Sequence, residues 1–432
     1  MELTILNMVL ALLILALVLL SGIWIAIGLA GLGLALFHFF LPAGMMRMVE
    51  TIQYNVVDDF ILAAIPLFIF MGSLLLKGDI ASKIYRGLTP LVSRLPGGLV
   101  QTNILSCAVF GACSGSSLAG AATMGTLAVR ELTERGYDRK LVYGSLAAGG
   151  TLATMIPPSI LFIIYGSFAG QSISTLFIAG LVPALIMVLL FMGYVALVAL
   201  KNPASCPRVE PASLGQILTA MKTLAAPVLL ITAVLGSIYS GFATPTESAA
   251  VGSVGALLIL LAERHLQWRV VREAAVMSVR TTCMIALMMI GAQLISTALS
   301  MLQIPFQISQ MILSLEMAPW VIALVVALFF ILLGCLIEGT SMFFLTFPII
   351  YPLMMDLGFD PIWFGVMMAL FIEMSLITPP VGLNLFIIHQ VSGEASMART
   401  IRGALPFFFA MLLMMLLFIA YPRLVLMLPN AF

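Results

Sequence analysis

Apolar segments long enough to cross a membrane recur along almost the whole sequence, and this feature limits the chain to few folds. A transmembrane helix needs about 20 apolar residues, and segments such as 176–200 and 281–302 meet that length. Only 9% of the residues are charged and 62% are hydrophobic, whereas soluble domains carry about 25% charged residues. The alternating segments of about ten residues that mark a transmembrane β-barrel are not visible. The sequence therefore predicts an all-α polytopic membrane protein.

Two apolar segments of the first half are interrupted by polar or proline-containing residues. One interruption is GACSGSS at 111–117, and the other is TMIPPS at 154–159. Such breaks are costly in lipid because no water satisfies the freed N–H and C=O groups, and they persist where the backbone lines an enclosed cavity. Each arm beside the first break has only about 16 residues, which is short for a span. We therefore predict a re-entrant helical hairpin at about 97–135, followed by a discontinuous transmembrane helix.

The second half of the chain repeats this pattern. A hairpin is predicted at about 320–357, with its break at 337–341, and the following segment breaks at Thr378-Pro379-Pro380. GYD at 136–138 recurs as GFD at 358–360, at the same offset that relates the two Pro-Pro pairs. Ordered matches at a constant offset indicate an internal repeat. The predicted division is a first repeat over 1–200, a linker over 201–222 and a second repeat over 223–432.

The distribution of basic residues predicts that the two repeats are inverted. Loops 77–96 and 130–140, beside the first hairpin, each contain four Lys or Arg, whereas loops 303–319 and 355–361 contain none. Because cytoplasmic loops are enriched in Lys and Arg, the first hairpin should open from the cytoplasm and the second from the opposite side. Both termini are predicted to be periplasmic. The first apolar run is expected to be a retained helix, because no basic region precedes it.

Composition argues against several other classes of protein. The net charge of +1 gives no electrostatic basis for binding nucleic acid, and the five cysteines form neither a metal spacing nor a disulfide framework. No polar stretch is long enough for an ATPase or a soluble catalytic domain. A membrane enzyme would need a nucleophile–base pair or metal cluster, which we do not find, and a channel would not require paired hairpins. We therefore expect neither an enzyme nor an organic cofactor.

Inverted repeats with discontinuous helices are typical of secondary transporters, in which carbonyls and hydroxyls at the breaks suit Na⁺ and half-helix N-termini suit an anion. The predicted Na⁺ candidates share a position at a hairpin tip or a break: Ser114, Gly115, Ser116, Ser117, Thr151, Thr154, Pro157, Gly339, Thr340, Ser341, Thr378 and Pro379. The predicted substrate candidates are Ser116, Ser117, Thr154, Ser159, Thr340, Ser341 and Asn384. For each hydroxyl the structural alternative is capping of exposed backbone. For the Gly/Ser-rich stretches it is close helix packing.

Three carboxylates fall within or beside apolar segments. Glu338 lies at the second hairpin tip, and Glu373 precedes the second Pro-Pro pair. For each of these two residues, a functional role and a purely structural hydrogen bond are alternatives of equal weight. Glu247 follows Thr244-Pro245-Thr246, where capping of a helix N-terminus is favoured. No Lys or Arg is expected near the bilayer centre. An anionic substrate would therefore be held by helix dipoles, hydroxyls and bound cations.

At the hairpin tips and helix breaks described above, the sequence resembles the DctM-like large membrane subunit of tripartite ATP-independent periplasmic (TRAP) transporters. The matching segments extend over nearly the whole chain: AIPLF at 64–68, GACSGSS at 111–117, GGTLATMIPP at 149–158, GFATPTESAA at 241–250, EGTS at 338–341 and ITPPVG at 377–382. The resemblance implies a bacterial inner-membrane importer of small organic acid anions, coupled to two or more Na⁺ ions. It also implies two separate partner proteins, a small four-helix DctQ-like membrane subunit and a soluble DctP-like periplasmic binding protein.

The resemblance further implies an elevator mechanism of the wider ion-transporter superfamily. A transport domain of about 60–168 and 281–390 would slide against a scaffold, and segments 42–59 and 263–280 would connect the two. The scaffold would comprise 1–41, 176–200, 223–262 and 403–425. Because Leu376 stands where the first repeat has Thr154, the two sodium sites should not be chemically identical. The alternative within the same superfamily is a stand-alone divalent-anion symporter, which would need no binding protein.

Overall fold

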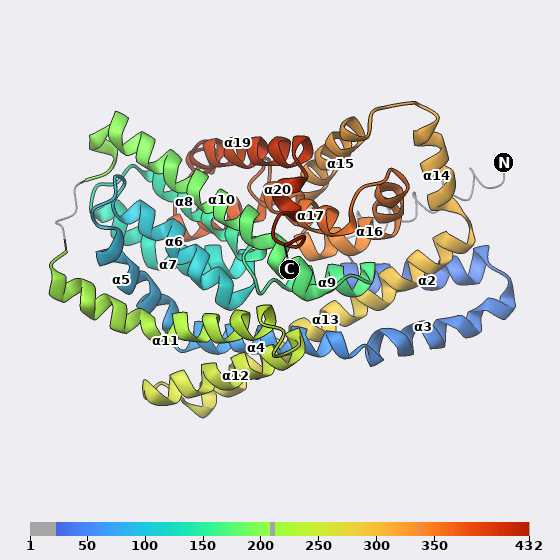
Figure 1. Cartoon of the computed structure of the whole chain (residues 1–432), viewed down its shortest axis with the longest axis horizontal. Helices are drawn as coiled ribbons and strands as arrows, with labels where there is room; N and C mark the ends of the chain where they lie inside the picture. Colours follow the sequence, from blue (N-terminus) through green and yellow to red (C-terminus); the bar gives the residue numbers. More distant parts are fainter. Residues whose placement is uncertain (1–22, 208–211, 336, 432) are drawn as a thin grey trace.

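The computed structural model describes residues 23–207, 212–335 and 337–431, and every regular element in these ranges is a helix. Most of the long helices run along the horizontal axis of Figure 1. Seven helices within the described ranges are long and apolar enough to cross a membrane. The predicted class, an all-α polytopic membrane protein, is confirmed. The helix predicted at the start of the chain falls within residues 1–22, outside the described residues.

The first half contains the predicted hairpin and the predicted broken helix. The hairpin is formed by α6 (Leu99–Ser114) and α7 (Ser117–Glu134), and the broken helix by α8 (Arg139–Met155) and α9 (Ile160–Ala169). Gly115, with a φ of 60°, ends α6 in the left-handed conformation that suits glycine. The other elements are α2 (Ile25–Phe40), η1 (Ala43–Met46), α3 (Arg47–Asp58), η2 (Phe60–Ala63), α4 (Ala64–Lys77), α5 (Ile80–Val92) and α10 (Ile173–Lys201).

The second half has the same hairpin and broken-helix arrangement. Its hairpin consists of α15 (Pro319–Gly334) and α16 (Gly339–Asp356), and its broken helix of α17 (Pro361–Leu376) and α18 (Leu383–Ser392). Both α8 and α17 stop just before a Pro-Pro pair, since proline lacks the N–H that helix continuation requires. The other elements are η3 (Pro203–Ser205), α11 (Leu214–Tyr239), α12 (Pro245–Ala262), α13 (Trp268–Met301), α14 (Ile304–Leu313), α19 (Ala398–Ala420) and α20 (Arg423–Leu426).

The helix bounds differ from the predicted segment bounds at three places. Within the predicted linker 201–222, α11 already begins at Leu214, because Ser213 and Gln216 form a capping box. The segments 263–280 and 281–302 belong mostly to one continuous helix, α13, whose composition changes from charged to apolar without a break. The segment 77–96, treated as a charged loop, contains the amphipathic helix α5.

Helices α2, α4, α5, α11, α12 and α13 pack against one another, and we call them the outer frame. Helix α4 lies between α12 and α13. Ser253 Oγ of α12 donates to the Leu67 carbonyl at 2.8 Å, and Ser278 Oγ of α13 donates to the Pro66 carbonyl at 2.6 Å. An ion pair between Lys83 of α5 and Glu263 ties a third helix to the end of α12. These polar links fix the helices of the frame relative to one another.

The first hairpin, α17, α18, α10 and α19 pack around α8, and the second hairpin packs against α17; we call the two hairpins, the two broken helices, α10 and α19 the inner bundle. The broken helix formed by α8 and α9 is the most buried of the long apolar spans, with 89% of its most apolar window inside the protein. Helix α8 contacts α19 backbone to backbone: a Cβ on Gly144 would lie 2.0 Å from the Gly403 carbonyl oxygen. Only glycine permits this approach at either position.

An aromatic cluster joins the two halves inside the inner bundle. Tyr165 and Phe168 of α9 pack edge-on against Phe343 and Phe347 of α16, with ring centroids 5.6–6.3 Å apart. The Tyr165 hydroxyl donates to the Pro361 carbonyl at the start of α17. Aromatic pairs at such distances contribute about 0.5–1.5 kcal/mol each beyond their area burial. The cluster therefore fixes the second hairpin to the first broken helix.

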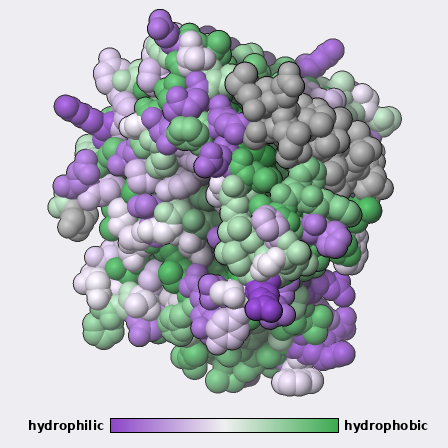
Figure 2. All heavy atoms as spheres, turned by 90° about the vertical axis from the view of Figure 1, so that its right-hand side faces the viewer, coloured by the Kyte–Doolittle hydropathy of each residue, from purple (hydrophilic) through white to green (hydrophobic). Residues whose placement is uncertain are grey.

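The connections beside the two hairpins lie toward opposite ends of the molecule. Those on either side of the first hairpin, 93–98 and 135–138, lie toward the left of Figure 1, whereas the α14–α15 connection lies at the right. Figure 2 views the right-hand end, where hydrophilic and hydrophobic side chains are interspersed. The left-hand end carries the basic residues of 130–140. This placement agrees with the opposite hairpin orientations expected from charge.

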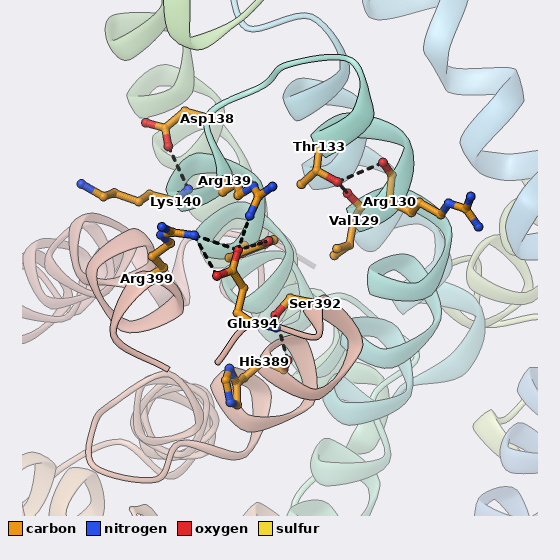
Figure 3. Close-up of polar contacts among 11 residues, drawn as sticks. Val129, Arg130, Thr133, Asp138, Arg139, Lys140, His389, Ser392, Glu394 and Arg399 are labelled. Atoms are coloured by element: carbon orange, nitrogen blue, oxygen red, sulfur yellow. Dashed lines mark hydrogen bonds and ion pairs between the residues drawn. The ribbon is translucent and has the colours of Figure 1, made fainter. Parts of the chain in front are cut away.

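At this basic end Glu394 links α8 to the start of α19 (Figure 3). Its carboxylate accepts hydrogen bonds from Arg139 at 2.8 Å and Tyr143 at 3.1 Å, and from Arg399 at 2.8 Å. Burial alone would raise the pKa of Glu394, but the bonds from Arg139, Tyr143 and Arg399 outweigh it and hold the pKa below its usual value. Glu394 therefore reinforces the contact between α8 and α19 from outside the membrane-spanning segments.

The lowered pKa of Glu394 predicts a loss of stability in acid. A carboxyl group with a lowered folded-state pKa stabilises the fold above its unfolded pKa, about 4.3 for glutamate, and this contribution is lost as the pH falls through the folded value. We expect the wild-type Tm in detergent to fall between about pH 5 and 3, and Glu394→Gln to show a smaller fall. The measurement is Tm against pH, with Glu134→Gln, on an exposed pair with Arg130, as the control. An identical pH profile in Glu394→Gln would contradict the assignment.

Candidate functional site

A cavity of about 200 Å³ lies where the inner bundle meets the outer frame. The bundle contributes both hairpin tips, the break after α8 and the last turns of α17, and the frame contributes α4 and α13. The tip of the first hairpin contacts α4 closely, since a Cβ on Gly72 would lie 2.9 Å from Ser114 Cα. The N-terminal residues of α7, α9 and α16 all line the cavity, so the positive ends of three helix dipoles lie at its wall.

The first hairpin tip contributes four predicted residues, 114–117, and all four line the cavity. Ser116 caps α7, with its hydroxyl accepting a hydrogen bond from the Ala119 N–H at 3.4 Å. Ser114 Oγ is buried and has no hydrogen-bond partner among the described residues. A buried hydroxyl without a partner is uncommon in proteins, and an ion or water at this position would satisfy it. The geometry thus separates a capping serine, Ser116, from an unpaired one, Ser114.

Ser117 connects the two halves of the chain through side chains. Its Oγ donates to the Glu373 carboxylate of α17 at 2.8 Å and accepts from Asn384 Nδ2 of α18 at 2.9 Å. Thr154, at the end of α8, is a second hydrogen-bond partner of Glu373. Glu373 is 1% exposed, and Asn384 Oδ1 is buried without a hydrogen-bond partner in the described part of the chain. These side chains lie together only because the two repeats pack face to face.

The second hairpin tip is organised around Glu338, which caps α16. Its carboxylate accepts from the Ser341 N–H at 3.1 Å and from Thr340 Oγ1 at 2.9 Å. Glu338, Gly339 and Thr340 line the cavity, whereas Ser341 is buried beside Met288. Glu338 therefore combines the two predicted alternatives. Its carboxylate makes a structural hydrogen bond that caps the helix, and the same side chain faces the cavity, where it could bind a ligand.

Several predicted residues do not line the cavity. Thr151 Oγ1 donates to the Ala148 carbonyl at 2.6 Å, and Thr378 Oγ1 to the Met374 carbonyl at 2.7 Å. Ser159 caps α9. Pro157 and Pro379 shape the two breaks without lining this cavity. Of these residues only Ser159 caps a helix, whereas Thr151 and Thr378 bond to carbonyls of α8 and α17, respectively.

Glu247 lies outside the site. It is exposed and forms a capping box with Thr244 at the N-terminus of α12, accepting from the Thr244 N–H at 2.8 Å. The structure confirms that Glu247 caps a helix, which is the role that the sequence favoured.

Sequence reasoning missed the frame side of the cavity. Ser73 of α4 and Thr281 of α13 line it, with Met277, Met284 and Ile285 beside them. Ser73 is 7% exposed and sits in an otherwise apolar segment next to Gly72. That small-residue pair was a usable signal, because small residues mark close helix contacts in membranes. Nothing in the local sequence of Thr281 distinguishes it from other threonines.

The fold and the cavity together define the general class to which this protein belongs. Hairpin tips and helix breaks from two halves of the chain meet at a cavity whose wall includes hydroxyls and two carboxyl groups, as in secondary transporters built from structural repeats. The particular family follows from comparison with known proteins: residues 11–424 match the family model of the tripartite ATP-independent periplasmic transporter, DctM component. The chain belongs to the DctM family, the large permease proteins of TRAP transporters.

Three relatives illustrate this membership. The C4-dicarboxylate TRAP transporter large permease protein DctM of Pseudomonas aeruginosa is 34% identical over 402 residues, covering 93% of each chain. The isethionate TRAP transporter permease protein DctMQ of Oleidesulfovibrio alaskensis is 31% identical over 405 residues, 93% of this chain and 63% of that relative. The crystal structure of the Alcanivorax borkumensis YdaH transporter superposes with a TM-score of 0.65 at 14% identity, covering 94% of this chain and 99% of the other. At that identity the structural likeness shows the fold alone.

Proposed function

We propose that this large permease imports small organic acid anions and that a Na⁺ gradient drives the import. The observation that carries the proposal is the charge of the cavity wall. Its titratable lining residues are two carboxylates, Glu338 and Glu373, and no Lys, Arg or His of the described chain lines it. When these carboxylates are ionised, they repel an anion unless cations enter with it. Coupled entry of cation and anion is therefore the arrangement this wall favours.

The oxygens around Ser117 supply suitable ligands for the cation. Hard alkali cations are bound by carboxylate, hydroxyl and carbonyl oxygens, often at discontinuous helices. The Glu373 carboxylate, the unpaired Ser114 Oγ and Asn384 Oδ1 provide such atoms. The N-termini of α7, α9 and α16 then provide N–H groups for the acid group of the substrate. The named substrates of two relatives, C4-dicarboxylates and isethionate, are organic acids of this kind.

We further propose an elevator movement of the inner bundle against the outer frame. This division differs from the one expected from the sequence, which placed 176–200 and 403–425 in the scaffold and 60–77 and 281–302 in the moving part. Helices α10 and α19 pack on α8, whereas α4 and α13 pack on α12 and α2. The glycine contact between α8 and α19 resists sliding, because it interlocks two backbones. The cavity lies between the two groups, where sliding would alternately expose it.

The assembly proposed is tripartite and located in a bacterial inner membrane, with both termini on the periplasmic side. The large permease would pair with a small four-helix subunit and receive substrate from a periplasmic binding protein. Support for the pairing comes from the isethionate relative, whose name joins M and Q and of whose length this chain covers 63%. A stand-alone symporter is the competing function, and it would transport without a binding protein.

Uptake into proteoliposomes tests the proposal. With the small subunit and the binding protein present, we expect uptake of an organic acid to require an inward Na⁺ gradient. Ser117→Ala should lower the apparent Na⁺ affinity about tenfold, because it removes a hydrogen bond to a buried charge. Thr340→Ala should have a smaller effect, because Thr340 contacts only the capping carboxylate of Glu338.

Thr297→Ala serves as the matched control, since its hydroxyl bonds only to its own helix, and it should behave as wild type. Uptake that proceeds equally without Na⁺ would contradict the coupling. Uptake without the binding protein would instead establish the stand-alone symporter.

A further inference from the structure

A second pocket, separate from the transport cavity, lies between α5 and α11 at the basic end of the molecule (Figure 1). Its volume is about 830 Å³, and it opens to the outside of the frame. The two helices that form its walls are held in close contact, since a Cβ on Gly87 of α5 would lie 2.7 Å from Leu224 Cγ of α11. The pocket is therefore a permanent feature of the frame rather than a gap between loosely packed helices.

The charged residues lining this pocket are mainly basic. They are Lys83, Arg86 and Lys222 with one acid, Glu263, which gives 3 − 1 = +2. Glu263 is paired with Lys83. Arg86 and Lys222 are exposed, and neither forms an ion pair or side-chain hydrogen bond with another residue of the described ranges. The two unpaired cations give the pocket a positive potential that favours an anion.

The uncharged polar groups of the pocket add a hydrogen-bond donor. Gln216 Oε1 accepts the Ser213 N–H at 2.8 Å, which leaves its amide NH₂ group directed away from the cap. The Thr219 hydroxyl already donates to the Gly215 carbonyl at 2.9 Å. The groups available to a ligand are thus a guanidinium, an ammonium and an amide NH₂. All of these donate, so the matching ligand is an anion rich in acceptor oxygens, such as a phosphate.

The pocket also adjoins the part of the surface that faces lipid. Only 28% of the most apolar window of α11 is buried. Leu214, Leu218 and Met221 form an exposed stripe on this helix, with 77%, 61% and 58% of their surface accessible. At 100° per residue, Lys222 lies between this stripe and the pocket residues. A molecule with an anionic head and apolar chains would contact the pocket and the stripe at once.

We propose that this pocket binds the phosphate headgroup of an anionic phospholipid, with the acyl chains along the 214–221 stripe. Basic pockets between transmembrane helices on the cytoplasmic side are suited to such headgroups. Arg86 and Lys222 contact the phosphate, and Gln216 donates to one of its oxygens or to the polar headgroup. Because the pocket belongs to the frame, the bound lipid would stabilise the part of the protein against which the inner bundle packs.

Lipid retention by the purified full chain tests this proposal. The protein is reconstituted in nanodiscs of phosphatidylcholine, alone or mixed with phosphatidylglycerol, and bound lipid is measured by native mass spectrometry after release. We expect phosphatidylglycerol to be retained selectively. The double variant Arg86→Gln with Lys222→Gln should weaken this retention about thirtyfold, which corresponds to about 2 kcal/mol for two basic residues. Exchanging the two residues, as Arg86→Lys with Lys222→Arg, should preserve it.

The control is Arg94→Gln with Lys201→Gln, which removes the same charge from exposed residues at the same end but outside the pocket. Equal losses in both double variants would overturn the proposal, because they would indicate a general surface-charge effect. Displacement of the lipid by inorganic phosphate would also overturn it in favour of a soluble anion. Unchanged lipid retention with loss of a co-purifying membrane protein would make the pocket a protein interface. The Tm of each variant checks that the fold is intact.

Discussion

Gly144→Ala is expected to destabilise the protein strongly. The new Cβ would lie 2.0 Å from the Gly403 carbonyl oxygen and 2.3 Å from its carbon, so two backbones would have to separate. Overpacking of a well-packed interior costs about 1–3 kcal/mol and sometimes more. We expect at least the upper end of this range here, because no flexible side chain can move aside. The measurement is thermal unfolding in detergent together with the yield of monodisperse protein.

Gly193→Ala in α10 is the matched control for this prediction. Gly193 lies in a membrane helix of the inner bundle, and no described atom lies within 4 Å of the place that its Cβ would occupy. Alanine is favoured over glycine in a helix by about 1 kcal/mol, so Gly193→Ala should be neutral or stabilising. Equal stability of the two variants would show that α8 and α19 can separate easily. It would also remove the main support for placing α19 in the moving group.

Glu373→Gln is expected to weaken the apparent affinity of transport for Na⁺ strongly while leaving the fold intact. Glutamine keeps the shape of the side chain and can still bond to Ser117, but unlike the carboxyl group it cannot ionise to bind a cation as a carboxylate. A hydrogen bond to a charged group contributes about 1.5–3 kcal/mol, so the apparent Na⁺ affinity should fall about 10- to 100-fold. Glu373→Asp, which retains the charge at a shifted position, should show an intermediate loss. The measurement is the initial uptake rate as a function of external Na⁺.

Glu247→Gln provides the comparison, because Glu247 is also a carboxylate beside an apolar segment but is exposed and caps α12. It should lose at most about 1 kcal/mol of stability and should retain the wild-type dependence on Na⁺. If Glu373→Gln retains that dependence as well, Glu373 is a structural partner of Ser117 and the cation is bound elsewhere. A loss in both variants would point to damage unrelated to the cavity.

The two carboxylates show how far sequence reasoning reached into the site. Both precede or follow a polar break, so their local sequences look alike, and the capping box at Glu247 was predictable from its spacing to Thr244. The partners of Glu373 were not predictable in the same way, because Ser117 lies 256 positions away in the chain. The hairpin tip and the carboxylate were each found as candidates. Their contact depends on how the two repeats pack.

The division into moving and fixed parts that we propose depends on tertiary packing in the same way. Sequence separated the hairpins and breaks from the continuous helices correctly, because polar residues and prolines within apolar segments have a direct backbone cost. The assignment of α10, α19, α4 and α13 to the scaffold or to the transport domain rested on the family resemblance, because each of these helices is an apolar segment without a distinguishing motif. The packing of α19 on α8 depends on Gly144 and Gly403, which are two of 35 glycines in the chain. Nothing local distinguishes these two from the others.

The sequence by itself determined the membrane class, the two hairpins, the two Pro-Pro breaks and the opposite orientation expected from charge. These features follow from local rules, because hydrophobic length, proline and basic loops act on the segment that carries them. Tertiary structure alone decided that Ser117, Glu373 and Asn384 meet, that Ser73 and Thr281 complete the cavity and that a basic pocket forms between α5 and α11. Such sites arise between helices distant in the chain, and which faces meet is set by packing of the whole molecule.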